Sequence, residues 1–416
     1  MAGSGLLLGE GPADWPQWRG PHRDGISQAV GLRKDWSSSP PPLVWQTAGM
    51  GRGFAAPAVV GDSIYLTGAD AGKEFVVALM KDSSTESAPP KTLWKTEISA
   101  AGDVGYPGSR CTPTMEEGKL YATTTAGTIA CLDQTSGKIV WQVDMVKEFG
   151  GKMMSVWGFS ESPLVDGDHV IVTPGSDEAA VVALDKKTGK EVWRSAIPKA
   201  KGAGYASLVV SEGAGVRQYV TLMGRGLVSV AARDGKLLWT YDRVANGTAN
   251  IPTPIVRGDY VFASTGYQTG SVLVQLSKKG ATGVEAKEVY FLPHKDLQNH
   301  HGGMVLIGEH LYGGHGHNEG APICVHFLTG KVSWLERRGP GDGSAAVSFA
   351  DGHLYFRYQN GKVALIEAKP DEYREKGTFM IPDVQDPSWP HPVIAGGKLL
   401  LREQDRLYAY DCSAGK

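Results

Sequence analysis

The sequence predicts an all-β protein: an eight-bladed β-propeller of four-stranded antiparallel blades, closed by an N-terminal strand that pairs in the last blade. Three observations carry this prediction. A unit of four short apolar runs recurs eight times along the 416 residues. The 55 glycines and 24 prolines supply the tight turns that such a repeat needs. The last unit lacks its fourth strand, whereas the N-terminal part contains one that belongs to no unit.

The third repeat shows the pattern most clearly. It starts at Pro163 with LVDGD, continues with HVIVTPGSDE and AAVVALDKKTGKEVW, and ends at Trp193. The apolar runs are short, and the turns between them contain Asp, Gly and Thr, as in an antiparallel meander. One repeat therefore predicts one four-stranded blade.

The other units align on the residue that precedes or begins their innermost strand. These anchors are Pro57, Pro113, Pro163, Leu208, Pro254, Met304, Val347 and Pro392. A Gly-Lys turn commonly leads into a last strand that ends in an aromatic residue. These aromatic residues are Trp94, Trp141, Trp193, Tyr290, Phe379, Trp239 and Trp334. We expect them to fill the wedges between neighbouring blades, where aromatic burial stabilises most.

The two ends of the chain predict how the ring closes. The eighth unit stops at residues 413–416, and PLVW ending at Trp45 supplies the missing strand from the other terminus. Closure of this kind removes exposed sheet edges. We therefore divide the chain into an N-terminal extension, residues 1–41, which packs on the propeller, and one propeller domain, residues 42–416. The segment DWPQWRG, residues 14–20, is expected to pack across the closure without chemistry of its own.

Composition excludes several classes of function. Lys and Arg number 42 against 44 Asp and Glu, so the chain lacks the basic surplus of nucleic-acid-binding proteins. No apolar run approaches the roughly 18 residues that a membrane-spanning helix needs. The four cysteines contain no CxxC pair, which favours small buried hydrophobic residues over metal or redox chemistry.

These motifs resemble the PQQ-like β-propeller repeat family, from about Pro42 to Lys416. That family includes quinoprotein alcohol dehydrogenases, the propeller lipoprotein of the outer-membrane assembly machinery and uncharacterised exported bacterial proteins. WPQWRGPHRDGIS and WGFSESP most resemble the last group. The resemblance implies a bacterial, periplasmic or otherwise exported protein. The run Leu6–Leu8 is too short for a signal sequence, so we expect that signal to be absent or replaced in this chain.

Blade geometry selects the candidate site. The loop entering the innermost strand and the loop between the second and third strands lie at the same end, around a central funnel. Polar and aromatic residues at these positions indicate a small polar or anionic ligand, with a sugar or sugar acid favoured; the alternative is a solvated funnel. The ligand- or cofactor-binding candidates are Arg52, Arg110, Trp157, Tyr205, Asn250, Trp389 and His391. The second loop adds Tyr267, His315, His317, Arg357 and Arg402.

Histidines cluster in blade six and its approach. Seven of the eleven are His294, His300, His301, His310, His315, His317 and His326. We predict Glu161, His300 and His301 as an acid–base catalytic set, and His300, His315 and His317 as ligands of a possible divalent metal. The alternative is that these are hydrogen-bonded loop histidines.

Three functions remain open at this level, and with them whether the protein is an enzyme. The first is binding of, or acid–base or metal-assisted chemistry on, a sugar or sugar acid. The second is a scaffold with a protein partner on its rim, of the outer-membrane assembly type. The third is a PQQ-dependent oxidoreductase, for which the resemblance implies that PQQ carboxylates meet Arg52 and Arg110 and that a cation lies near Glu161 and Asn250. The chain lacks the vicinal cysteine pair and the CxxCH haem site of many such enzymes.

Overall fold

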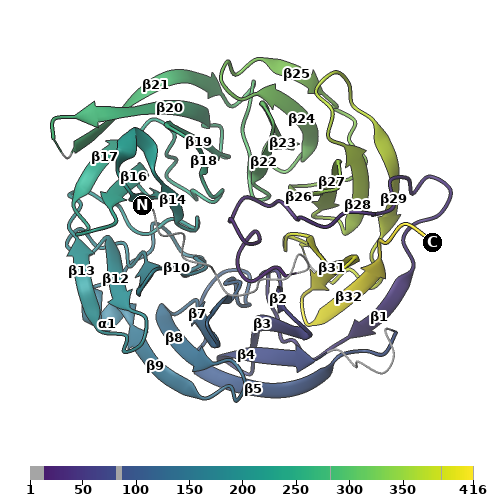
Figure 1. The fold of residues 1–416 in the computed structure, drawn as a ribbon, viewed down its shortest axis with the longest axis horizontal. Coiled ribbons are helices and arrows are strands. Elements are labelled where there is room, and N and C mark those ends of the chain that lie inside the picture. The colour runs from purple at the N-terminus through teal and green to yellow at the C-terminus, as the bar shows by residue number, and fades with distance from the viewer. Residues whose placement is uncertain (1–13, 81–86, 282, 386, 416) are drawn as a thin grey trace, which may run out of the picture.

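The computed structural model describes residues 14–80, 87–281, 283–385 and 387–415. The described residues form eight four-stranded antiparallel sheets arranged around a central axis (Figure 1), which confirms the predicted propeller. The run Leu6–Leu8, on which the prediction about the signal sequence rests, lies outside the described residues. Among the described residues, no helix is both long and apolar enough to cross a bilayer.

Each blade is a meander that runs from the axis outward, apart from the last one. Blade one contains β2 (Ala58–Val60), β3 (Ser63–Asp70), β4 (Lys73–Met80) and β5 (Lys91–Ala100); blade two contains β6 (Thr114–Glu116), β7 (Lys119–Thr123), β8 (Thr128–Asp133) and β9 (Ile139–Asp144), followed by helix α1 (Met145–Phe149). Blade three contains β10 (Leu164–Asp166), β11 (His169–Val172), β12 (Val181–Asp185) and β13 (Glu191–Ser195); blade four contains β14 (Val209–Ser211), the 3₁₀ turn η1 (Gly213–Gly215), β15 (Gln218–Met223), β16 (Gly226–Ala231) and β17 (Leu237–Tyr241).

The second half of the ring repeats the same order. Blade five contains β18 (Ile255–Arg257), β19 (Tyr260–Thr265), β20 (Gly270–Lys279) and β21 (Gly283–Pro293); blade six contains β22 (Met304–Ile307), β23 (His310–His315), β24 (Ala321–His326) and β25 (Val332–Leu335). Blade seven contains β26 (Ala345–Ala350), β27 (His353–Tyr358), β28 (Lys362–Glu367) and β29 (Glu375–Met380); blade eight contains β30 (Val393–Ala395), β31 (Lys398–Glu403), β32 (Arg406–Asp411) and, from the other end of the chain, β1 (Leu43–Thr47).

Strand β1 closes the ring as predicted. It pairs antiparallel with β32, with Gln46 opposite Tyr408 and Thr47 opposite Leu407. Trp45 lies opposite Ala409 and is buried. The closure therefore repeats the outer-strand pattern of the other blades.

The outer tryptophans lie opposite small residues on the neighbouring strand. Trp141 faces Cys131, Trp193 faces Ala183, and Trp334 faces Cys324 across each strand pair. A small partner leaves room for the indole ring, so these cysteines serve packing, and all four cysteines are buried and unpaired.

The glycine of the Gly-Lys turn packs against the outer aromatic residue of the preceding blade, as Gly189 shows. Gly189 has a φ of +71°, and a Cβ placed on it would lie 2.7 Å from the ring of Trp141. The same indole donates from Nε1 to the carbonyl oxygen of Lys186 at 3.0 Å. Both the turn geometry and the close ring contact therefore require glycine at this position.

The N-terminal segment crosses the central axis, as the purple ribbon shows in Figure 1. Trp15 pairs with Val59 of blade one, Arg23 donates to the carbonyl oxygens of Ser162 and Pro163 before blade three, and Ile26 pairs with Phe349 of blade seven. The sequence predicted that residues 14–20 pack across the closure of the ring. The innermost strands instead offer unpaired backbone groups around the whole channel, and the segment binds several of them.

Candidate functional site

Two cavities lie at opposite ends of the channel, on either side of the N-terminal segment. The upper cavity has a volume of about 300 Å³ and the lower one of about 500 Å³. Arg19 lines both of them. The segment therefore forms the floor of the upper cavity.

The upper cavity is built from the two sets of loops that the sequence analysis selected. The loop from β5 to β6 carries Arg110, and the loop from β21 to β22 carries His300 and His301. The hairpin between β19 and β20 carries Tyr267, and the one between β23 and β24 carries His317. The predicted residues that line it are Arg110, Trp157, Tyr205, Tyr267, His300, His301, His317, Trp389 and His391.

Aromatic rings form most of the cavity wall. The centroid of the Trp389 ring lies 5.0 Å from Phe54, 5.0 Å from Tyr106 and 4.4 Å from His301. Its Nε1 donates to Oε1 of Gln359 at 2.8 Å, which fixes the orientation of the indole. Such rings offer flat apolar faces on which a sugar or another ring can stack.

The charged groups of the cavity are positive. Arg110 donates to the carbonyl oxygens of Gly108 (2.9 Å) and Gly105 (2.8 Å), so its guanidinium is held by the loop backbone. Burial lowers the pKa of Arg110 to about 10, which leaves it charged at neutral pH. Among the described residues that line the cavity, none is Asp, Glu or Lys. The arrangement therefore favours an anion over a cation.

His300 sits at the centre of a hydrogen-bond chain. Its Nδ1 lies 2.9 Å from Oδ1 of Asn318 and 2.8 Å from Oγ of Ser344, and its Nε2 lies 3.1 Å from the hydroxyl of Tyr267. Because an amide oxygen can only accept, we assign the proton to Nδ1, and Nε2 then accepts from Tyr267. Burial, and next the nearby His317, lower the pKa of His300 to about 4, so the ring is neutral at pH 7.

His301 and His391 are also neutral. The ring of His301 stacks on His300 with centroids 3.7 Å apart, and burial lowers its pKa well below the usual value. Burial has the same effect on the pKa of His391, and the nearby charge of Arg19 adds to it. Neutral imidazoles can accept as well as donate protons.

Glu161 does not line the upper cavity. Its Oε1 accepts from the backbone N–H of Thr173 at 2.9 Å, and its charge interacts with Arg23 of the N-terminal segment. Burial raises the pKa of Glu161 to about 7. Glu161 is therefore not in the cavity wall with His300 and His301, because its carboxylate binds the backbone of Thr173.

Two further binding candidates also lie outside this lining. Asn250 is fully buried, accepts from the N–H of Asn246 and donates to the carbonyl oxygen of Met223, so its amide holds a loop. Arg52 is exposed, and its backbone pairs with Ala69 at the edge of blade one.

The structure brings two of the three predicted metal ligands together, because the rings of His300 and His317 lie with their centroids 4.1 Å apart. His317 lines the cavity, whereas His315 is buried and its Nδ1 accepts from the N–H of Gln298 at 3.4 Å. Strand β23 ends at His315, and Gly316 has a φ of +96°, so the chain turns between the two histidines of the His-x-His pair. Within the described ranges, no group of three His, Cys, Asp or Glu residues could hold a metal ion.

The arginines predicted from the second loop are structural. Arg357 forms a fully buried ion pair with Glu403 at 2.7 Å. Arg402 donates to the carbonyl oxygens of Thr67 (2.8 Å) and Gly51 (3.0 Å), so it joins blade eight to blade one. Both side chains lie between blades and do not line the upper cavity.

Two residues from outside the repeat, Trp18 and Arg19, also line the cavity, and the repeat pattern did not predict them. Trp18 donates from Nε1 to Oγ1 of Thr253 at 3.0 Å, and its ring packs edge-on against His391 with centroids 4.7 Å apart. Arg19 is 2% exposed and donates to the carbonyl oxygens of Asp24 and Met304. The only signal was the motif WPQWRG, whose aromatic and charged residues belong to no blade.

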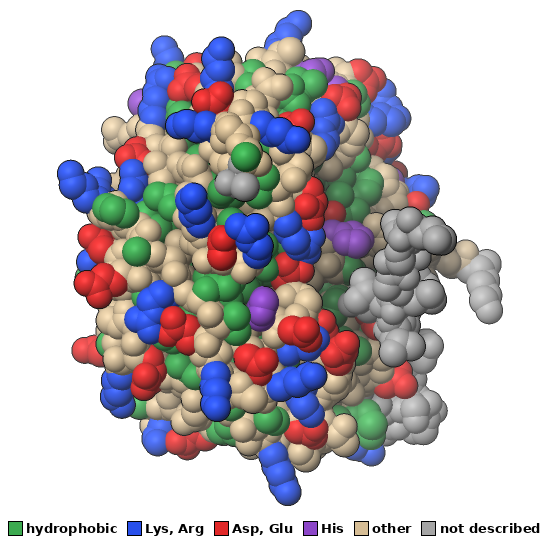
Figure 2. Space-filling view, turned by 60° about the vertical axis from the view of Figure 1, so that its left-hand side comes forward, with side chains coloured by type: hydrophobic (Ala, Val, Ile, Leu, Met, Phe, Trp, Pro, Cys, Tyr) green, Lys and Arg blue, Asp and Glu red, His purple; other side chains and the backbone are tan. Residues whose placement is uncertain are grey.

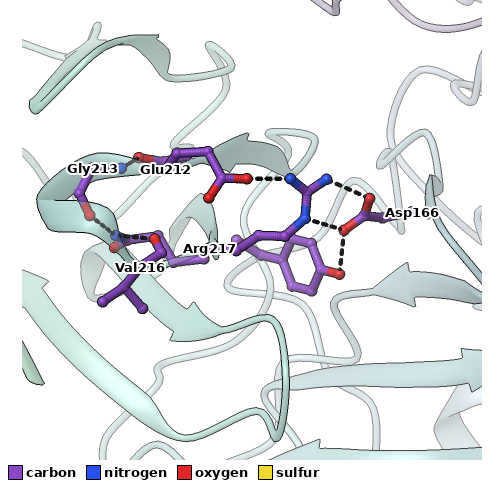
Figure 3. Close-up of polar contacts among 8 residues, drawn as sticks. Asp166, Glu212, Gly213, Val216 and Arg217 are labelled. Atoms are coloured by element: carbon purple, nitrogen blue, oxygen red, sulfur yellow. Dashed lines mark hydrogen bonds and ion pairs between the residues drawn. The ribbon is translucent and has the colours of Figure 1, made fainter. Parts of the chain in front are cut away.

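The lower cavity holds a self-contained charge network (Figure 3). Nε and Nη2 of Arg217 donate to the two carboxylate oxygens of Asp166 at 3.0 and 2.6 Å. Arg217 also contacts Glu212, and Tyr219 donates to Asp166 at 2.7 Å. Because these charges satisfy one another across blades three and four, the upper cavity is the better candidate site.

The residues present do not fit the PQQ arrangement that the resemblance implied. Arg52, Glu161 and Asn250 do not line the upper cavity, and no described lining residue supplies a carboxylate for a cation. We therefore derive no chemistry through a quinone.

Comparison with known proteins places the chain in a family. The family model described as outer membrane protein assembly factor BamB matches residues 83–336, more than half of the chain. BamB of Salmonella typhimurium is 30% identical over 143 residues, which cover 34% of this chain and 35% of that protein. The dehydrogenase subunit of the quinone alcohol dehydrogenase of Acetobacter aceti is 27% identical over 203 residues, covering 46% of this chain and 27% of that protein.

These matches span about a third or less of the curated relatives. The structure of BamB from Moraxella catarrhalis superposes with a TM-score of 0.63 at 14% identity, covering 90% of this chain and 98% of that one, which shows a shared fold. Since the family model covers most of the repeats, this chain belongs to the PQQ-like repeat propellers of the BamB-like family.

Proposed function

We propose that this protein binds a small anionic sugar, a sugar acid, in the upper cavity. The observation that carries the proposal is a wall of aromatic rings around Arg110 that contains no described Asp, Glu or Lys. A carboxylate on the ligand would meet the Arg110 cation, and the sugar ring would stack on Trp389 or Trp157. The cavity volume of about 300 Å³ suits one or two sugar units, at the small end of ligand sites.

The hydroxyl groups of such a ligand also have partners. His317, Gln359 and Asn318 line the same cavity and offer both donors and acceptors. Because His300, His301 and His391 are neutral, they add no positive charge to the site. A strongly positive site would bind any anion, whether or not it carries a sugar ring. The combination therefore favours a sugar acid over an inorganic anion.

A second candidate function follows from the family match. BamB is named for outer-membrane assembly, which favours an exported protein with a protein partner on its rim. Exposed apolar side chains are scattered over the outer strands, such as Leu93 on β5, Val192 on β13 and Val289 on β21. Figure 2 shows lysine and arginine interspersed with acidic side chains over one side of the molecule. A protein-binding surface usually carries a contiguous apolar patch, whereas the exposed apolar residues here are scattered among charged ones. The lined cavity therefore supports ligand binding better than the surface supports a scaffold function.

The test is calorimetry and thermal melting with galacturonate and glucuronate, against galactose and glucose as neutral controls. Wild-type protein should bind the acids and show little response to the neutral sugars. Arg110→Gln should weaken binding of the acids about 10- to 100-fold, since a charge-assisted hydrogen bond is lost. Arg243→Gln is the matched control, because Arg243 pairs with Glu288 away from the cavity.

Two other results would favour a different function. Absence of binding by both acids would contradict the proposal, and recovery of a stoichiometric protein partner would then support the scaffold. A quinone absorption band in the purified protein would support an oxidoreductase instead.

A further inference from the structure

Tyr267, His300, Asn318 and Ser344 form one hydrogen-bond chain on the wall of the upper cavity. The Tyr267 hydroxyl lies 3.1 Å from Nε2 of His300, and Nδ1 of His300 lies 2.9 Å from Asn318 and 2.8 Å from Ser344. Tyr267, His300 and Asn318 all line the cavity. A hydroxyl, a base and a group that orients the base are thus linked in series.

The direction of these bonds decides what the hydroxyl can do. With its Nδ1 proton directed to Asn318 and Ser344, His300 presents the Nε2 lone pair to Tyr267. The phenolic proton therefore points toward His300. The lone pairs of the Tyr267 oxygen remain free to accept a proton from a substrate. The phenolic proton that Tyr267 then loses can pass to Nε2 of His300.

The backbone holds two members of this chain in an unfavourable conformation. Tyr267 has a φ of +54° and Asn318 a φ of +68°. Asparagine tolerates this region, whereas a bulky tyrosine rarely adopts it. Such conformations persist where the surrounding structure requires them, and they concentrate at functional sites.

The adjacent glycine allows the two loops to approach. A Cβ on Gly266 would lie 3.1 Å from Nδ1 of His317 and 3.3 Å from Cα of His300. A larger residue would push the β19–β20 hairpin away from blade six. The hairpin is therefore built to bring the Tyr267 hydroxyl to the imidazole.

We propose that Tyr267 and His300 form a proton relay that makes this protein a lyase for 4-linked uronic acid chains. The inference rests on the proposed binding of a sugar acid. The Tyr267 oxygen takes the C5 proton, which is α to the carboxylate, while the phenolic proton passes to Nε2 of His300. The C5–H electron pair becomes the C4=C5 double bond, and the C4–O bond breaks with its pair on the glycosidic oxygen. His300 then returns its proton through Tyr267 to that oxygen, which restores both residues.

Elimination fits the cavity better than hydrolysis does. Ordinary glycoside hydrolysis uses a pair of carboxylates, and no described residue of the cavity lining supplies even one. Elimination needs instead a cation beside the substrate carboxylate, to make the α proton more acidic, and a base near that proton. Arg110 and the Tyr267–His300 pair supply these two groups.

The experiment incubates the full chain with oligomers of galacturonic, glucuronic and mannuronic acid. Elimination produces a double bond conjugated to the carboxylate, which absorbs in the ultraviolet, and fragments whose masses sum to that of the substrate. Hydrolysis would add one water and produce no such absorbance. Galacturonate and glucuronate binding is measured on the same preparations.

Wild-type protein should cleave at least one of the three oligomers with ultraviolet-absorbing product. Tyr267→Phe should lower the rate at least about 100-fold while binding of the acid changes less than about threefold. His300→Gln is the second variant. Asn318→Ala removes the acceptor at Nδ1 of His300 as well as a group of the cavity lining, and should shift the pH profile of the remaining activity. Tyr373→Phe is the matched control, because its hydroxyl contacts Glu375 on the outer strand of blade seven.

Retained binding without ultraviolet-absorbing product from any oligomer would overturn the lyase and leave the binding proposal intact. Unchanged cleavage by both Tyr267→Phe and His300→Gln would overturn the relay. Failure of wild-type protein to bind any of these acids or cleave their oligomers would overturn both proposals.

Discussion

The hydroxyl group of Tyr267 lies within hydrogen-bond distance of Nε2 of His300, although the two residues belong to different blades. Tyr267 is on the hairpin of blade five and His300 on the entry loop of blade six. The contact therefore depends on how two neighbouring blades pack, and it joins local turn geometry to the arrangement of the whole ring.

Low pH should abolish proton transfer from Tyr267 to His300. Because burial lowers the pKa of His300 from 6.5 to about 4, the ring can accept a proton at neutral pH and loses this ability as the pH falls through about 4. We expect the rate of uronate cleavage to be level above that pH and to fall below it, in a pH profile measured with protein that remains folded. A rate that falls already near pH 6.5 would show that His300 is not the acceptor.

Replacement of Glu161 should change stability and leave ligand binding unaltered. Burial raises its pKa from 4.5 to about 7, so the folded state holds a proton that the unfolded state releases, and this contribution to stability is lost as the pH rises from about 4.5 to 7. Glu161→Gln should therefore raise the free energy of unfolding by up to about 3 kcal/mol above pH 7 and have little effect below pH 4.5. Denaturant unfolding at both pH values tests this, with the exposed Glu178→Gln as control. Loss of sugar-acid binding would place Glu161 back in the site.

Loss of one outer tryptophan should destabilise the whole ring. Trp141 is buried against Gly189 of the next blade, and Trp141→Ala should lower the free energy of unfolding by about 3–5 kcal/mol through the cavity that it leaves. The neighbouring Val140 is 47% exposed, and Val140→Ala should change stability by less than about 0.5 kcal/mol. Equal effects of the two changes in urea titrations would contradict the assigned packing role.

The buried ion pair between blades seven and eight should tolerate loss of both partners better than loss of one. Arg357→Met alone leaves the Glu403 carboxylate buried without its cation and should cost about 3–5 kcal/mol. Arg357→Met combined with Glu403→Leu should recover part of that loss. Arg233→Met, at an exposed pair with Asp234, is the control and should cost less than about 1 kcal/mol. Thermal melts of the three variants decide between these outcomes.

Much of the fold was predictable because it depends on local patterns. Strands of period two, turns rich in Gly and Asp, and an aromatic residue at the end of a unit, usually tryptophan, together determine where a blade starts and ends. Strand β10 begins at Leu164, directly after the anchor Pro163, and β1 closes the ring at Trp45. Even the two loops that surround the cavity followed from the order of the strands.

The sequence by itself therefore determined the repeat, the number of blades, the closing strand and the loops that line the funnel. Only the tertiary structure decided which side chains of those loops reach the cavity. Glu161 and His300 both lie on the loop that enters the innermost strand of their blade, yet one interacts with Arg23 and the other with Tyr267. The orientation of a loop side chain depends on partners supplied by other blades and by the segment that carries Trp18, and no spacing within one repeat encodes those partners.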